Sequence, residues 1–179
     1  MHPPSKNRNQ ISLGLGCVVV TETPSVVRTV LGSCVAVIFH VPRLRISALC
    51  HAQMPERDSD SRCLESCPTP CASDVPDSNE FKYVTCCTRH MLRALRRLGV
   101  VKREIVATVV GGANVILDID PRWSVASRNV SMAMSLLERE AIPITYADTG
   151  GIRGRVIEHV SDLNRTKIRY HGPTDTSRR

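Results

Sequence analysis

A short break in a Val-rich run carries the side chain best suited to covalent chemistry. Gly32 and Ser33 interrupt the run immediately before Cys34, after which Val-Ala-Val resumes it. Such a break exposes a thiol together with neighbouring backbone N–H groups. Nucleophilic acyl transfer needs both, because a thiolate attacks the carbonyl carbon while preorganised donors stabilise the developing oxyanion. We therefore predict Cys34 as a nucleophile, with oxyanion support from the backbone at Gly32 and Ser33.

A base for this thiol stands at the end of the next predicted strand. His51 follows Cys34 after one short turn, so adjacent antiparallel strands would return the imidazole beside the thiol. With an unperturbed pKa of about 6.5, histidine can accept the thiol proton and later pass it to a leaving amine. Thr29 could orient the ring through its hydroxyl. The residues alone leave a second reading open, in which Cys34 is a small core residue and His51 a solvated strand end.

The segments that must position these residues are short apolar runs, rich in Val and Ile and separated by Gly or Pro. They predict strands at 11–20, 25–30, 34–39, 45–51, 104–110, 144–147, 154–160 and 166–170. Amphipathic helices are predicted at 81–98, closed by Gly99, and at 126–140. Consecutive strands lie close enough in sequence to pair directly. The sequence thus predicts an α+β fold, an α/β/β-type layered sandwich of about eight strands with two main helices.

Length predicts one domain over residues 1–179, because a single core usually serves about 100–200 residues. Residues 1–10 and 171–179 are expected to be flexible tails. The stretch 56–79 is rich in Ser, Asp, Pro and Cys and is expected to be a mobile loop insertion.

A thiol cluster is a further candidate site within this insertion. Cys63, Cys67 and Cys71 recur at regular spacing, and with Cys86 or Cys87 from the first helix they could offer four thiolates to zinc. The alternative is a polar loop whose thiols bind nothing. Acyl transfer by Cys34 itself needs no metal or cofactor.

Composition indicates the cellular compartment of the protein and the charge of its partner. The chain carries eight Cys but begins with a polar stretch in place of a signal-peptide core, so we expect a cytoplasmic protein with reduced thiols. No stretch approaches the about 20 apolar residues needed for membrane insertion, and six aromatic residues offer little for stacking nucleic-acid bases. A net charge of +7 favours an acidic partner. Arg89, Arg93, Arg96 and Arg97 share one predicted helix, either as a solvated face or as a docking face.

Glycine-rich turns follow two of the predicted strands. Gly111 and Gly112, followed by Ala113, either wall the site or simply turn the chain. The Asp-Thr-Gly-Gly stretch at 148–151 predicts a hairpin turn. Neither glycine pair has the Lys and the spacing of a phosphate-binding loop, so no nucleotide cofactor is indicated. Asn129, near the start of the second predicted helix, either caps it or bonds a loop, and capping is the commoner role for Asn there.

Several short motifs follow one another in a fixed order along the chain. They are Leu31-Gly32-Ser33-Cys34-Val35-Ala36-Val37, Ala48-Leu49-Cys50-His51-Ala52-Gln53-Met54-Pro55, Val110-Gly111-Gly112-Ala113-Asn114, Ser127-Arg128-Asn129-Val130, and Ala147-Asp148-Thr149-Gly150-Gly151 with Gly154-Arg155. Together they resemble the signature of the CheD family of bacterial chemoreceptor glutamine deamidases. The resemblance runs over about residues 11–170, without the Cys-rich stretch.

This resemblance implies what the residues alone leave open. It implies Cys34 as nucleophile, His51 as general base and Thr29 as third member of the site. It implies that the substrate is Gln in the cytoplasmic helical bundle of methyl-accepting chemotaxis receptors, converted to Glu, with a CheC-type phosphatase as a candidate partner. The alternatives are a non-catalytic binding module that regulates such a phosphatase or receptor, and a methyl-esterase that uses the same thiol.

Overall fold

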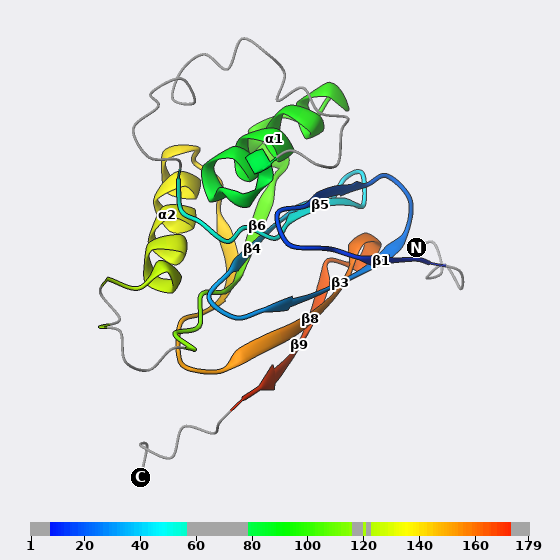
Figure 1. Ribbon diagram of the computed structural model, residues 1–179. Coiled ribbons are helices and arrows are strands. Elements are labelled where there is room, and N and C mark those ends of the chain that lie inside the picture. Colours follow the sequence, from blue (N-terminus) through cyan, green and yellow to red (C-terminus); the bar gives the residue numbers. More distant parts are fainter. Residues whose placement is uncertain (1–7, 57–78, 116–119, 121–122, 173–179) are drawn as a thin grey trace.

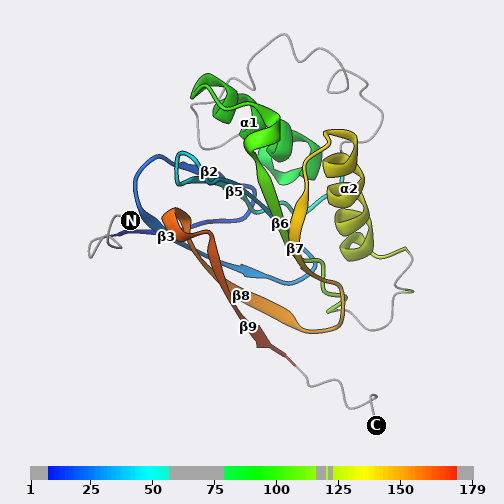
Figure 2. The ribbon, with the colours of Figure 1, turned by 180° about the vertical axis from the view of Figure 1, so that it is seen from behind.

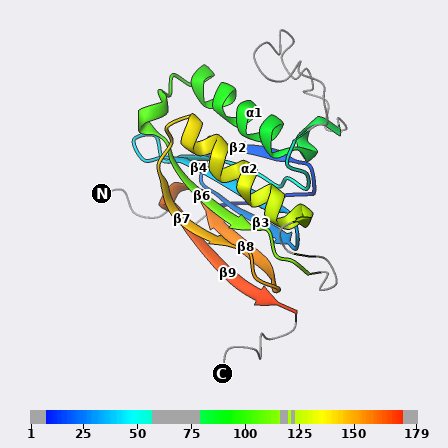
Figure 3. The same ribbon diagram turned by 90° about the vertical axis from the view of Figure 1, so that its left-hand side faces the viewer.

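The computed structural model describes residues 8–56, 79–115, 120 and 123–172, which form two α-helices and nine strands (Figure 1). These elements stack in three layers. Helices α1 and α2 cover one face of a five-stranded sheet, and a four-stranded sheet lies on the other side (Figures 2 and 3). The arrangement confirms the predicted layered α+β sandwich.

The five-stranded sheet forms the middle layer, in the order β2-β5-β4-β6-β7. Its strands are β2 (Val18–Thr21), β5 (Ile46–Cys50), β4 (Val35–Val41), β6 (Val106–Gly111) and β7 (Ile144–Thr149). Neighbours pair antiparallel except β6 and β7, which run parallel. Since α2 lies between β6 and β7 in sequence, it provides the crossover that parallel pairing requires.

The four-stranded sheet has the order β1-β3-β8-β9. Its strands are β1 (Asn9–Ser12), β3 (Ser25–Leu31), β8 (Gly154–Val160) and β9 (Arg165–His171). β1 runs parallel to β3, and the other pairs are antiparallel. β8 has the predicted bounds.

Burial on both faces explains why β4 is apolar along most of its length. Val35, Val37 and Phe39 pack in the core beneath the helices, whereas Ala36 and Ile38 pack in the core between the two sheets. β3 is covered on one face only along most of its length, so its residues alternate between buried and exposed from Val27 to Leu31. The fold therefore has two apolar layers, and the β3–β4 turn joins strands of both sheets.

Individual residues and turns next to the two helices set where each helix begins and ends. α1 (Val84–Arg97) starts three residues later than predicted, because a 3₁₀ turn, η2 (Asn79–Lys82), precedes it. Gly99, at φ +76°, follows its end as expected. α2 (Val125–Arg139) is capped by Ser124, whose Oγ accepts a hydrogen bond from the Ser127 N–H at 3.1 Å. The expectation that Asn129 caps this helix is therefore wrong. Two further 3₁₀ turns are η3 (Lys102–Glu104) and η5 (Ser161–Leu163).

The single strand predicted at 11–20 is wrong, because this segment crosses from one sheet to the other. β1 pairs with β3 in the four-stranded sheet, whereas β2 pairs with β5 in the five-stranded sheet. Gly16 turns the chain between them with φ +67°. Apolar residues on both sides of the turn made the run look continuous. The crossing raises the number of strands to nine and brings residues 13–17 beside β3 and β5.

Some expectations concern residues outside the described part of the chain. These residues are 57–78, which hold most of the expected insertion with Cys63, Cys67 and Cys71, and residues 1–7 and 173–179 of the expected tails. Within the expected tails, Asn9 and Gln10 belong to β1 and His171 to β9. No helix among the described residues combines the length and the apolar character needed to cross a bilayer.

Candidate functional site

The turn between β3 and β4 carries the predicted nucleophile. Gly32, Ser33 and Cys34 are the three residues between these strands. Cys34 is half-buried and packs against the apolar layer between the two sheets. The thiol therefore lies where that layer meets the surface.

The predicted base comes from β5, the antiparallel neighbour of β4. A bridge between Val35 and Ala52 continues the register of this strand pair. His51 then lies opposite Ala36, and Cys34, two residues before Ala36, faces the same side on the diagonal. The thiol and the buried imidazole thus share the layer between the sheets, as the sequence predicted.

Thr29 fixes the orientation of the His51 ring. Thr29 Oγ1 lies 2.8 Å from His51 Nδ1 and 2.8 Å from the carbonyl oxygen of Leu13. A hydroxyl has one hydrogen and a carbonyl only accepts, so Thr29 donates to Leu13 and accepts from the Nδ1–H of neutral His51. The free lone pair of the ring is then on Nε2. This buried nitrogen has no hydrogen-bond partner among the described residues, so the fold itself does not use it.

The backbone of His51 is held by the segment that crosses between the sheets. Its N–H donates to the Cys17 carbonyl at 3.0 Å, and its carbonyl accepts from the Gly16 N–H at 2.8 Å. Gly16, at φ +67°, and Cys17 together oppose His51, which is the pattern of a G1 β-bulge. The bulge therefore ends the β2–β5 pairing and fixes the strand end that carries the ring.

Burial keeps both candidate groups uncharged at neutral pH. It raises the pKa of the Cys34 thiol, and the backbone N–H of Cys34 offsets this effect only in part. Burial also lowers the pKa of His51, an effect that the Leu13 carbonyl partly offsets. The thiol and the imidazole are thus both neutral, so the thiol proton has to be transferred during any reaction of the sulfur.

Gly111, Gly112 and Ala113 form a wall against the nucleophile turn. A Cβ on Gly111, which has φ +118°, would lie 2.3 Å from the Cys34 carbonyl oxygen. The Gly112 N–H donates to that carbonyl at 2.7 Å, and the Ala113 N–H donates to the Gly32 carbonyl at 2.9 Å. Of the two sequence-based readings, contact with the site is the one observed, and Gly111 has no room for a side chain.

The turn after β7 contacts this wall, but it is not the predicted hairpin, because it leads from β7 in the five-stranded sheet to β8 in the four-stranded sheet. The Gly150 N–H donates to the Gly111 carbonyl at 2.9 Å. The Asp148 carboxylate accepts from the Arg155 guanidinium at 2.8 Å instead of facing the thiol. Asp148 therefore lies in β7 and joins it to β8 of the other sheet, which fits a structural role but not a place in a hairpin turn.

Asn129 bonds a loop, which is the less favoured of the two roles that the sequence left open. It lies fully buried in the second turn of α2, and its Nδ2 donates to the carbonyls of Ser33 and Gln53, each at 3.0 Å. Asparagine has low helix propensity, because its side chain competes for backbone hydrogen bonds. Its position inside a predicted helix was the available signal that the side chain has another task.

A cavity of about 400 Å³ lies away from these residues, at the opposite end of β6. Its lining includes Arg89, Arg93 and Arg96 of α1 and the buried Ile105. Neither Cys34, His51 nor Thr29 contributes to it. The predicted docking face of α1 thus borders a hollow, and its role stays a prediction.

The thiol cluster falls largely outside the described residues. Cys86 is buried in α1, with its sulfur 4.0 Å from Thr85 Oγ1. Within the described ranges, no group of three or more His, Cys, Asp or Glu is placed to hold a metal ion. The zinc reading therefore stays a prediction about residues 63–71.

Comparison with known proteins links the chain to one family. Residues 68–170 match the family described as "CheD chemotactic sensory transduction". A protein of Anaeromyxobacter dehalogenans, named "Probable chemoreceptor glutamine deamidase CheD 1", is 32% identical over 164 residues, covering 89% of this chain and 84% of that protein. Similarly named proteins of Maridesulfovibrio salexigens and Geobacter sulfurreducens are 35% and 33% identical, covering 74% of this chain in each case and 74% and 71% of their own lengths.

Proposed function

Because the chain belongs to the CheD family, we propose that it is a chemoreceptor glutamine deamidase in which Cys34 is the nucleophile and His51 the general base. One observation carries the assignment of these residues. The hydrogen bonds from His51 to Thr29 and from Thr29 to Leu13 leave Nε2 as the basic ring nitrogen, on the face of the sheet that Cys34 shares. Thr29 is accordingly the third member of the site.

Acylation begins with the Cys34 sulfur attacking the side-chain carboxamide carbon of glutamine. His51 Nε2 takes the thiol proton, and a negative charge develops on the carboxamide oxygen. Backbone N–H groups of the Gly32–Cys34 turn stabilise that oxyanion. His51 then gives its proton to the amine nitrogen, and the C–N bond breaks. Ammonia departs, and the substrate side chain stays bound to Cys34 as a thioester.

Deacylation repeats the same proton transfers with water. His51 Nε2 removes a proton from the water molecule, whose oxygen attacks the thioester carbon. The C–S bond breaks, the thiol regains a proton, and the side chain leaves as glutamate. Glutamine and water thus give glutamate and ammonia, without metal or redox chemistry.

The substrate and the compartment follow from this assignment. Chemoreceptors present their modified helices in the cytoplasm, where the thiol of Cys34 stays reduced. We expect the cytoplasmic helical bundle to be the substrate and a CheC-type phosphatase to be a second partner. A binding module without chemistry would need neither a half-buried thiol nor an imidazole with a spare nitrogen, so catalysis is the better supported function.

Incubation with receptor cytoplasmic fragments tests the proposal. Mass spectrometry should find a mass increase of about one dalton at specific Gln residues, because an amide nitrogen is replaced by oxygen. Fragments that carry glutamate methyl esters distinguish an esterase, which would remove the methyl group instead. Cys34→Ala provides the control, and modification of Gln by this folded variant would exclude the mechanism.

A further inference from the structure

The amide of Asn129 joins the two chain segments that carry the nucleophile and the base. Its Nδ2 donates one hydrogen to the Ser33 carbonyl, immediately before Cys34, and the other to the Gln53 carbonyl, two residues after His51. Both bonds are 3.0 Å long, and the side chain is fully buried. An NH₂ group has two hydrogens, so both are used in this bridge.

All three carbonyls of the nucleophile turn accept hydrogen bonds from the same part of the fold. The Gly32 carbonyl accepts from Ala113, the Cys34 carbonyl from Gly112, and the Ser33 carbonyl between them from Asn129. The turn is therefore held through its oxygens along its whole length. Only the middle bond comes from a side chain, so only that one can be removed by substitution.

These bonds decide where the N–H groups of the turn point. No described peptide bond is cis, and in a trans peptide the C=O and N–H lie on opposite sides. Val35 follows this rule, since the Cys34 carbonyl bonds Gly112 while the Val35 N–H bonds the Ala52 carbonyl at 2.9 Å. By the same rule the Ser33–Cys34 peptide directs the Cys34 N–H away from Asn129. This N–H and the sulfur belong to the same residue, so the N–H lies beside the position where an oxyanion forms after attack.

We propose that Asn129 is a positioning residue of the deamidation site: by holding the Ser33 carbonyl it aims the Cys34 N–H at the oxyanion, while its bond to the Gln53 carbonyl fixes the amide itself. This inference rests on the proposed function. A merely structural role for Asn129 predicts a loss of stability alone, because helix α2 would be anchored less well. The positioning role predicts a loss in the step that forms an oxyanion.

Two reactions of the same thiol separate these roles. Deamidation of a short Gln peptide passes through an oxyanion, whereas alkylation of Cys34 by iodoacetamide does not. Asn129→Ala should lower kcat for deamidation about 100-fold with little change in KM, the usual effect of losing an oxyanion donor. Alkylation of Cys34, followed by mass spectrometry of its peptide, should change by less than about threefold, because the thiol and His51 remain.

Ser124→Ala is the matched control. It removes the N-cap of the same helix, so it destabilises α2 without touching the nucleophile turn. Its kcat should stay at the wild-type value. Asn129→Leu, which has the same number of side-chain heavy atoms and the same branching but no donors, replaces Asn129→Ala if that variant does not fold, and the same loss of kcat is expected.

Three outcomes would overturn the inference. Unchanged kcat in Asn129→Ala would remove any role in the reaction, and an equal loss of alkylation and deamidation would place its effect on the thiol or base. A comparable loss of kcat in Ser124→Ala would reduce its effect to the stability of α2. Failure of the proposed function would look different, because wild-type protein would then leave Gln peptides unmodified or Cys34→Ala would remain active.

Discussion

Two histidines lie in the layer between the sheets, near opposite ends of β5, and each has a threonine hydroxyl at Nδ1. His51 Nδ1 is 2.8 Å from Thr29, and His159 Nδ1 is 2.9 Å from Thr166. The second ring nitrogen distinguishes them. His159 Nε2 is bonded to Ser47 Oγ at 3.0 Å, whereas His51 Nε2 has no partner among the described residues.

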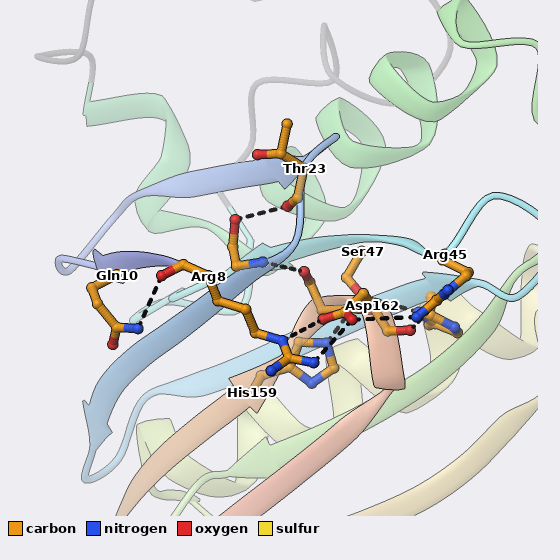
Figure 4. A network of polar contacts seen from close by, with 10 residues as sticks. Arg8, Gln10, Thr23, Arg45, Ser47, His159 and Asp162 are labelled. Carbon is orange, nitrogen blue, oxygen red and sulfur yellow. Dashed lines mark hydrogen bonds and ion pairs between the residues drawn. The ribbon is translucent and has the colours of Figure 1, made fainter. Parts of the chain in front are cut away.

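Ser47 completes a closed network at the His159 end (Figure 4). Its hydroxyl donates to the Ser161 carbonyl at 3.0 Å, and it therefore accepts from ring N–H groups of both His40 and His159. The hydroxyl of Ser47 and both ring nitrogens of His159 are therefore all paired within the fold. Neighbouring Asp162 is paired with Arg8 and Arg45, which closes the same end further.

The difference shows that a buried histidine with a hydroxyl partner is not by itself a sign of catalysis. Burial lowers the pKa of His159 to about 4, with a smaller effect from His40, and its pairing fixes one neutral tautomer. At His51 the same kind of hydroxyl bond directs a spare nitrogen towards the layer that Cys34 borders. A ring nitrogen left free in a buried site is the better sign of chemistry.

The largest expected effect is at the His51 end of β5, where Cys34 and His51 are the proposed reacting groups. Cys34→Ala and His51→Ala should each lower kcat/KM for Gln deamidation more than about 100-fold, because each removes an obligatory nucleophile or proton carrier. Peptide turnover and circular dichroism would be measured together. Ordinary turnover by either folded variant would contradict the proposed roles of Cys34 and His51.

Acid should weaken the closed end. Folding depresses the pKa of His159 to about 4, whereas in the unfolded chain it is about 6.5, so the unfolded state binds more protons between these values. This stability is complete above about pH 6.5 and lost as pH falls towards 4, by about 3 kcal/mol in total. His40 and His51, whose pKa values burial also lowers, act in the same direction.

Urea unfolding at a series of pH values between 7 and 4 measures this effect. His159→Gln keeps a polar side chain but does not titrate, so its stability should depend on pH less steeply. A variant with the full wild-type slope would show that His159 does not carry the acid sensitivity.

Ser47→Ala tests whether the closed end is purely structural. The change leaves two ring N–H groups and the Ser161 carbonyl without their partner, so we expect a loss of about 1–3 kcal/mol in the free energy of unfolding. Because Ser47 is remote from Cys34, kcat/KM of the folded variant should stay within about twofold of wild type. A large loss of turnover without a loss of stability would mean that the two ends are coupled.

Thr29→Ala should have the smallest effect. An orienting hydrogen bond contributes about 0.5–1.5 kcal/mol, so turnover should fall about 2- to 13-fold, well short of the His51→Ala effect. Thr29→Ser keeps the hydroxyl and should retain most activity. If Thr29→Ala is as inactive as Cys34→Ala, or if it is fully active, the orienting role of Thr29 is wrong.

The local sequence pattern was sufficient to predict most of the fold. β8 follows from the alternation of apolar and polar residues, and both helices follow from the amphipathic spacing of apolar residues. The crossing at Gly16 could not be predicted, because apolar residues on either side serve two different sheets. In the site, Cys34 and His51 are near in sequence and flank the β4–β5 pair, so their placement on the same face of the sheet followed from a hairpin. Asn129 joins segments about 75 to 95 residues away in the chain, and such a contact exists only after α2 packs on the sheet.

The passage of residues 13–17 between the sheets bears on how the protein should be labelled. Leu13 accepts the hydroxyl hydrogen of Thr29, and Cys17 accepts the backbone hydrogen of His51, so this segment supports the base from two sides. It is anchored through β1, a four-residue edge strand that a bulky fusion at the N-terminal side could displace. β9 lies at the other edge of the same sheet and makes no described hydrogen bond to Thr29 or His51. A fluorophore, affinity tag or surface tether for kinetic work therefore belongs at the C-terminal side.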